Sequence, residues 1–390
     1  MIVVAWVLIG LVARMLVVFG AVSQLEIPEQ EDALSTRIIK EHLAAASNYI
    51  DRDIIREDGH VRLYAIYGNE TGIENPDATN SEAMSYNLLL HALDEDKRGF
   101  DATLDYIEET MLHELGYMMW RVEENGSVIN DGENVASDAD LRMIKALLIA
   151  EERWGEQRYT ALIDRVANGL EQVAITNDTY LASYGGAGWV GDEVWLSYAD
   201  YTVFSELAER RGGPWPIVYE HMKQATIDGQ VINGLFNPQL TVERKYAIGI
   251  DGGGHSINAM WIMVRCAESD DPELREAAQR ALTFYAERYE IDAQLFALYN
   301  PNGDPLSSYD TAWTYALVGR AAAELGDDEF ASTMTEKLLE FQEMDRMSRV
   351  YGAIPEGKDE SLRVGQFTMQ ESMLTLHAFL NMKRNFWFGG

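Results

Sequence analysis

The sequence has a single cysteine and few basic side chains. Cys266 is the only cysteine among 390 residues, which excludes an internal disulfide and a cysteine-rich metal site. It lies in the apolar run MWIMVRC, where we expect a buried structural thiol. The chain has 31 basic and 64 acidic residues and a formal charge of −33. Such a chain repels polyanions, so we expect no nucleic-acid partner.

Lysine is the scarcer of the two basic residue types, with only 8 occurrences in the sequence. Abundant acid combined with scarce lysine resembles the surfaces of salt-adapted, halophilic proteins. The simpler alternative is an acidic, soluble surface without any adaptation to salt. We favour salt adaptation as an expectation that a stability measurement can test.

The first 22 residues, MIVVAWVLIGLVARMLVVFGAV, differ in kind from the rest. Arg14 is their only charged side chain, and the segment is long enough to span a bilayer. We interpret residues 1–23 as a signal anchor in preference to a cleaved signal peptide, for which AVS at 21–23 offers a cleavage site. A buried core helix is the remaining alternative. Either targeting segment would leave residues 24–390 outside the cytoplasm, tethered to the membrane if uncleaved and secreted if cleaved.

Beyond residue 30 the pattern is helical almost throughout. Apolar residues recur at spacings of three and four in about a dozen blocks, which Gly, Asn, Asp and Pro separate. The spacing predicts helices over 33–51, 81–94, 100–115, 138–154, 157–173, 198–210, 215–226, 255–268, 272–288, 309–325, 328–343 and 367–382.

Alternate blocks open in a similar way. They read SEAMSYNLLL at 81, SDADLRMIKALL at 137, SYADYTVFSEL at 197, SINAMWIMV at 256 and SYDTAWTYALV at 308, and FTMQESMLTLHAF at 367 stands sixth. Each opening has a small polar residue suited to N-capping, and the helix that follows is apolar on most faces. The intervening helices are amphipathic. Six such pairs predict an all-α fold, an (α/α)6 barrel of six inner and six outer helices; an open superhelical array is the alternative.

Acidic residues recur at the starts of the inner helices. Glu82 begins the first, Asp138 the second and Asp310 the fifth, and Asp251 lies just before the fourth. An acid in a first helical turn is stabilised by the helix dipole, which is the plainest reading of each one alone. In a barrel, however, all inner helices start at the same end, so these carboxyls would face one cleft. Paired carboxylates held apart are what cleavage of a glycosidic bond requires.

At these positions the sequence resembles glycoside hydrolase family 8. ASDADLRMIKALLIAEERW, from 136, looks like the family signature A-[ST]-D-[AG]-D followed by an aliphatic helix. NSEAMSYNLLLHAL, from 80, is similar to its S-E-G-x-x-Y-G-M block, with Ala83 and Asn87 replacing glycines. LSYADYTVFSEL and NGLFNPQ resemble two further segments, so the likeness runs in order over residues 80–260.

The resemblance implies an (α/α)6 barrel that hydrolyses β-1,4-linked glucans, xylans or chitosan with inversion and needs no cofactor. It makes Glu82 the general acid and Asp138 the carboxylate that stabilises the distorted sugar, with Asp140 as a structural helix cap. The family's base is the Asp of a YDAxR motif. Order and interval favour Asp251, the local spelling SYDTAW favours Asp310, and neither is followed by the family's arginine.

Aromatic side chains could line a sugar cleft, because sugar rings stack their C–H faces on flat rings. About half of the candidates are expected to be ordinary core residues. They are Trp120, Tyr184, Trp189, Trp195, Tyr198, Trp261 and Trp313. No histidine pair has metal-ligand spacing, so no metal site is expected.

The sequence therefore predicts an inverting, endo-acting glycoside hydrolase that acts on a β-1,4-linked polysaccharide at the extracellular face. One alternative within the enzymes is another (α/α)6 enzyme, such as an unsaturated-glucuronyl hydrolase or a polysaccharide lyase. The other is a catalytically impaired barrel that binds glycans at the cell surface, which the altered motif glycines and the missing arginine favour.

Overall fold

The computed structural model describes residues 35–67, 75–129, 132–176, 179–241, 245–247, 257–358 and 363–388. The hydrophobic segment 1–23 and the candidate base Asp251 lie outside these ranges. Within them, no helix is long and apolar enough to cross a membrane.

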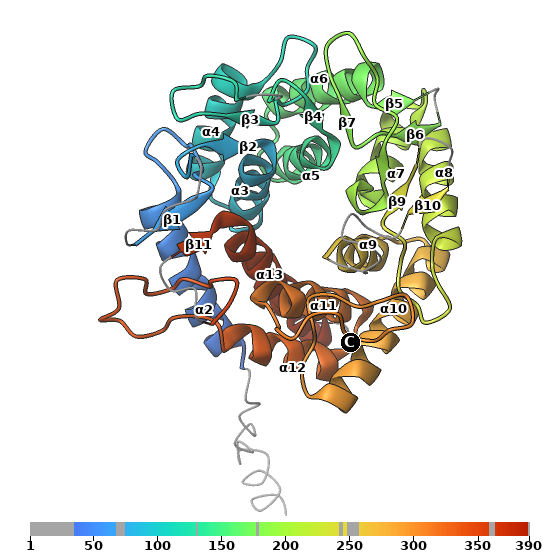
Figure 1. Cartoon of the computed structure of the whole chain (residues 1–390). Helices are drawn as coiled ribbons and strands as arrows, with labels where there is room; N and C mark the ends of the chain where they lie inside the picture. Colours follow the sequence, from blue (N-terminus) through green and yellow to red (C-terminus); the bar gives the residue numbers. More distant parts are fainter. Residues whose placement is uncertain are drawn as a thin grey trace, which may run out of the picture.

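The described helices form two concentric layers (Figure 1). The inner layer consists of α3 (Ser81–Leu93), α5 (Ser137–Trp154), α7 (Tyr201–Arg211), α9 (Ile257–Ala267), α11 (Ala312–Leu325) and α13 (Gln366–Phe388). The outer layer consists of α2 (Thr36–Tyr49), α4 (Lys97–Tyr106), α6 (Gln157–Val173), α8 (Trp215–Asp228), α10 (Pro272–Asp292) and α12 (Asp328–Leu339). Short π-helical turns extend α2 and α4, as η1 (Ile50–Ile54) and η2 (Ile107–Met111). This mostly helical arrangement is consistent with the predicted barrel.

The ring closes because the last inner helix returns to the first. α13 packs against α3 on one side and α11 on the other, and α11 also packs against α9. The inner helices α3, α9 and α11 are buried nearly all round, and every residue of α11 from Ala312 to Ala323 is buried. Cys266 in α9 has no exposed surface, which confirms the expected buried thiol.

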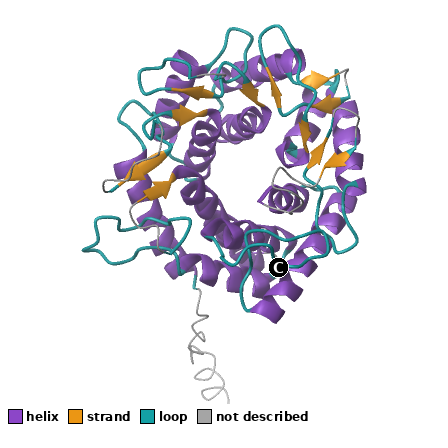
Figure 2. Cartoon of the chain, in the orientation of Figure 1, coloured by secondary structure: helices purple, strands orange, loops and turns teal. Residues whose placement is uncertain are grey.

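Short antiparallel ladders precede most of the inner helices (Figure 2). Several of them join loops that are distant in sequence, so they fix how the loops at this end of the ring lie against one another. The pairs are β1 (Tyr64–Ile66) with β11 (Arg363–Gly365), β2 (Thr79–Asn80) with β3 (Arg121–Val122), β4 (Val135–Ala136) with β7 (Tyr184–Gly185), β5 (Ile175–Thr176) with β6 (Tyr180–Leu181), and β9 (Gln239–Leu240) with both β8 (Val194–Trp195) and β10 (Tyr246–Ala247). A 3-10 turn, η3 (Leu196–Tyr198), follows β8.

The predicted capping of inner helices by small polar residues is confirmed at three of them, although none of the three caps is a serine. Asn80, Asp200 and Thr311 cap α3, α7 and α11, each accepting from the backbone N–H three residues on. Ser137 is itself the first residue of α5, whose N-cap Ala136 has no side-chain acceptor. The reason is the ladder between β4 and β7, which keeps the backbone extended through Ala136.

Candidate active site

Glu82 lies in the first turn of α3, at the end of the ring where the ladders lie. Its carboxyl accepts hydrogen bonds from Trp120 Nε1 and from Ser81 Oγ, each at 3.2 Å. Burial, followed by the negative charge of Asp138, raises the pKa of Glu82 to about 7. A carboxyl with this pKa still carries its proton near neutral pH, which suits a general acid.

Asp138 lies at the start of α5, and Arg142 one turn later holds it. Arg142 Nη2 donates to Asp138 Oδ2 at 3.0 Å, and both side chains are almost fully buried. The second carboxylate oxygen, Oδ1, is buried without a protein partner. Arg142 Nη1 donates to Ser85 Oγ at 3.0 Å, so the guanidinium bridges α5 and α3. The cation therefore fixes Asp138 at the start of α5 and compensates its charge.

Replacing Arg142 with methionine should lower the free energy of unfolding by about 3–5 kcal/mol, because Asp138 would remain as an uncompensated buried charge. Chemical denaturation at pH 7 measures the loss. The double variant Arg142→Met, Asp138→Asn removes both charges and should recover much of it. A single variant within about 1 kcal/mol of the wild type, the range of exposed pairs, or a double variant no more stable than the single one, would contradict this reading.

Asp140 does not cap α5 as the sequence analysis expected. Its carboxyl Oδ1 instead accepts from the backbone N–H of Met118 at 2.9 Å, and the side chain is fully buried. Burial raises the pKa of this carboxyl well above its usual range. Asp140 therefore ties the segment that carries Trp120 to the start of α5. Its role is structural, as expected, but by a different contact.

A cavity of about 260 Å³ contains Glu82. Its walls come from three inner helices and from the ladder between β1 and β11, and they are mostly aromatic or apolar. The lining residues are Leu63, Tyr64, Asn80, Glu82, Tyr86, Trp261, Gly365, Gln366 and Phe367. Of the predicted cleft aromatics, Trp261 lies in this wall and Trp120 contacts Glu82 directly. An acid beside flat rings is the arrangement that a sugar subsite needs.

Tyr184 and Tyr198 form a second pair of aromatic rings near the two acids. Their hydroxyls lie 3.1 Å apart. Burial raises the pKa of both hydroxyls, and the charges of Asp138 and Glu82 add to the effect in each. These two tyrosines thus share the electrostatic environment of the carboxyls, and their role in a sugar cleft stays a prediction.

The other three predicted aromatics have different surroundings. Trp195 is buried, packs against Tyr198 with ring centroids 6.2 Å apart, and donates its N–H to Glu193. Trp189 is 47% exposed in the loop that follows β7. Trp313, on α11, is buried, and its Nε1 donates to Glu356 Oε1 at 3.2 Å. Trp195 therefore supports the tyrosine pair, and the cleft role of Trp189 and Trp313 stays a prediction.

Asp310 precedes α11 and is bound by its own helix. Tyr315 OH donates to Asp310 Oδ2 at 2.8 Å. The pKa of Lys337 on the outer helix α12 is raised chiefly by Glu340 and to a smaller extent by the charge of Asp310. Asp310 is thus bound by the helix that follows it, whereas the charge of Asp138 acts on Glu82. The other candidate base, Asp251, lies outside the described residues.

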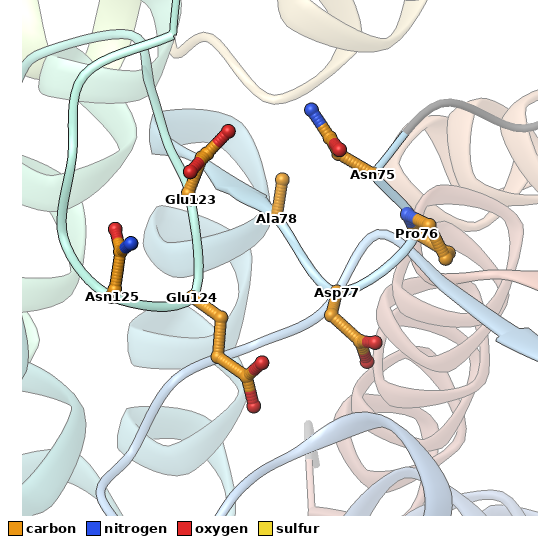
Figure 3. A pocket seen from close by; sticks show the side chains of 7 residues that line it. All are labelled: Asn75, Pro76, Asp77, Ala78, Glu123, Glu124 and Asn125. Atoms are coloured by element: carbon orange, nitrogen blue, oxygen red, sulfur yellow. The ribbon is translucent and has the colours of Figure 1, made fainter.

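A larger hollow of about 490 Å³ lies next to the ladder between β2 and β3 (Figure 3). It does not contain Glu82, and its lining is polar. Asp77 and Glu124 both bind Arg56, at 2.9 and 3.1 Å. The full lining is Asn75, Pro76, Asp77, Ala78, Glu123, Glu124 and Asn125. Because aromatic walls are missing from this lining and Glu82 lies outside it, we place the candidate active site at the smaller cavity.

Sequence reasoning missed a chain of buried polar contacts behind that cavity. The guanidinium of Arg142 lies 3.8 Å above the ring of Tyr86, whose hydroxyl donates to Glu371 on α13. Arg320 on α11 also binds Glu371, at 3.2 Å. A charged residue inside an apolar inner-helix block was the available signal, as in FTMQESM and ALVGRAAA. Among the described residues, no group of three or more His, Cys, Asp or Glu side chains could hold a metal.

Comparison with known proteins links this site to a family. Residues 56–239 match the sequence model of glycosyl hydrolases family 8. The chain is similar to this family over just under half of its length. The matched segment contains Glu82 and Asp138, and both candidate bases lie beyond its end. The match thus confirms the resemblance seen in the two motifs that carry these acids.

Curated relatives that match part of this chain are endoglucanases. An endoglucanase of Escherichia coli O157:H7 is 29% identical over 153 residues, 36% of this chain and 41% of the relative. Endoglucanase A of Acetivibrio thermocellus is 27% identical over 137 residues, 33% of this chain and 28% of the relative. The chain therefore spans well under half the length of these relatives.

Solved structures resemble this chain over most of its length. A novel alpha-amylase from Clostridium perfringens has a TM-score of 0.75 at 23% identity, covering 87% of this chain and 98% of the other. A GH8 xylobiose complex from Teredinibacter turnerae has a TM-score of 0.66 at 17% identity, covering 90% and 94%. At these identities the likeness shows the shared fold.

Proposed function

We propose that this protein is an endo-acting, inverting glycoside hydrolase with an (α/α)6 barrel, and that it cleaves a β-1,4-linked glucan, xylan or chitosan. One observation carries the proposal: Glu82 and Asp138 stand at the starts of two inner helices, and burial together with the charge of Asp138 raises the pKa of Glu82 to about 7. The endoglucanase relatives and the xylobiose complex of a structural neighbour support a β-1,4-linked substrate.

The two carboxyls divide the work because their surroundings differ. Glu82, protonated near neutral pH, gives its proton to the oxygen of the leaving sugar. Asp138, paired with Arg142, carries negative charge toward the sugar ring, where positive charge develops as the bond breaks. A base on the opposite face of the ring then takes a proton from the attacking water. We assign that base to Asp251 from its order and interval in the sequence, and because Tyr315 OH already binds Asp310 at 2.8 Å.

The decisive experiment is an assay of reducing ends released from a panel of β-1,4-linked glucans, xylans and chitosans. We expect release from at least one of them, with a mixture of short products that marks internal cleavage. Tight binding to one polysaccharide without release of reducing ends would instead identify a glycan-binding barrel. Unsaturated products that absorb in the ultraviolet would identify a polysaccharide lyase.

We further propose that the protein acts outside the cytoplasm and is adapted to salt. The apolar segment 1–23 supports the first point and the charge of −33 supports the second. Separating cell membranes, culture medium and cytoplasm tests the location. Recovery in the cytoplasmic fraction alone would contradict it.

The melting temperature of the purified protein should rise between about 0.1 and 2 M KCl. An excess of 33 negative charges repels itself when the Debye length is long, and molar salt shortens that length to about 3 Å. Differential scanning calorimetry measures the trend, with a matched series in sucrose as a control for excluded solute. A flat or falling melting temperature in KCl would contradict salt adaptation.

A further inference from the structure

Glu371 is a buried acid at the centre of the inner layer. It lies in the first two turns of α13 and is only 1% exposed. Its Oε1 accepts from Tyr86 OH on α3 and from Trp261 Nε1 on α9, the latter at 3.0 Å. Its Oε2 accepts from Arg320 Nη1 on α11 at 3.2 Å. One carboxylate thus joins three other inner helices to its own.

Two of these three donors are walls of the cavity that contains Glu82. Tyr86 and Trp261 both line it. Phe367 packs edge-on against both rings, with centroids 6.3 Å from Tyr86 and 5.3 Å from Trp261. Glu371 is absent from the lining, so it lies behind the wall and contacts the outer edge of each ring. Its hydrogen bonds therefore determine the orientation of the two rings in the cavity wall.

The same contacts continue to Asp138. The ring of Tyr86 supports the guanidinium of Arg142 at 3.8 Å, a distance typical of a strong cation–π contact. Arg142 in turn binds Asp138 at 3.0 Å. A shift of Tyr86 would therefore be felt both at the cavity wall and at the second carboxylate.

We propose that Glu371 is a positioning residue, which holds Tyr86 and Trp261 in place beside Glu82 and, through Tyr86 and Arg142, fixes Asp138. The proposal rests on the hydrolysis proposed above. A carboxylate is suited to the task because its two oxygens accept from three donors at once. A glutamine of the same shape has one acceptor oxygen, and its amide N–H₂ would face either Arg320 or the Tyr86–Trp261 pair. One set of contacts would be lost.

The first test is Glu371→Gln with Ser372→Ala as the matched control. Ser372 is the neighbouring buried residue on α13, and its hydroxyl donates within the helix to Thr368 O at 2.6 Å, away from the cavity. Glu371→Gln should lower kcat/KM on a soluble oligosaccharide by about 10- to 100-fold, as expected of a small displacement at a reacting site. Ser372→Ala should change kcat/KM less than about twofold, even if it lowers the melting temperature by as much as Glu371→Gln does. Equal effects in the two variants would overturn the proposal.

A double-mutant cycle separates positioning from a general structural role. Tyr86→Phe removes the hydroxyl that Glu371 binds and keeps the ring under Arg142. If Glu371 acts through Tyr86, the loss of kcat/KM caused by Glu371→Gln should shrink several-fold in the Tyr86→Phe background, since the contact is already absent. Effects that simply multiply would mean that Glu371 does not act through this tyrosine.

A binding measurement keeps the two proposals distinguishable. Calorimetry with a β-1,4-linked hexasaccharide in the Glu82→Gln background needs no turnover. We expect Glu371→Gln, added to this background, to weaken binding by about tenfold, and Ser372→Ala to leave binding unchanged. This result would support Glu371 as a positioning residue even if the wild type hydrolyses nothing. In that case the proposed hydrolysis alone fails. Unchanged binding and unchanged kcat/KM in Glu371→Gln, or a wild type that binds no oligosaccharide, would overturn the role of Glu371.

Discussion

Replacing Glu82 with glutamine is expected to lower kcat on a β-1,4-linked polysaccharide by about 10²–10⁴-fold, the usual worth of general acid–base catalysis. Glutamine keeps the shape of the side chain, and its amide can still accept the N–H of Trp120, which Glu82 binds at 3.2 Å. What it lacks is the proton for the leaving oxygen. Steady-state kinetics on the best substrate from the panel measure the loss.

The leaving group provides the control for this variant. In a dinitrophenyl glycoside the leaving group is dinitrophenolate. It departs as a stable anion and needs no proton from the protein. The Glu82→Gln variant should therefore lose less than about tenfold on that substrate, because the remaining steps do not use the acid. An equal loss on both substrates would show that Glu82 supports binding or folding and does not donate the proton.

The second large effect concerns the base. Asp251→Asn should lower kcat by about 10²–10⁴-fold, since the attacking water would lose its proton acceptor. Asp310→Asn should cost much less, because Tyr315 OH already binds Asp310. Each variant is compared with the wild type by kcat and by melting temperature, which separates lost chemistry from lost folding. The reverse pattern would identify Asp310 as the base.

The helices were predictable because their cause is local. Apolar spacing predicted blocks at 157–173 and 272–288, and the structure has α6 at Gln157–Val173 and α10 at Pro272–Asp292. Alternation of all-round apolar and amphipathic blocks was enough to predict the two layers. Helix caps were less predictable, because the ladder between β4 and β7 decides where α5 begins and joins loops about 50 residues apart.

Part of the site was predictable for the same reason. Glu82 and Asp138 each stand at the start of an inner helix, and a closed ring brings such starts together. The partners that determine their chemistry come from elsewhere: Trp120 from a loop and the Tyr86–Glu371 contact from helices 285 residues apart. No local pattern encodes such pairs. Charged residues within apolar blocks, such as Arg142 and Glu371, indicate only that some buried partner must exist.

The pH dependence of kcat/KM tests the central claim most directly, because it reports the protonation of the free protein's acid. If Glu82 donates the proton, kcat/KM should hold up to a pH of about 7, the raised pKa of this carboxyl. It should then fall about tenfold for each further pH unit as the carboxyl ionises. The falling limb should vanish in Glu82→Gln, which has no proton to lose. A limb that begins near the ordinary glutamate pKa of 4.5, or one that survives unchanged in Glu82→Gln, would contradict the assignment of Glu82 as the acid.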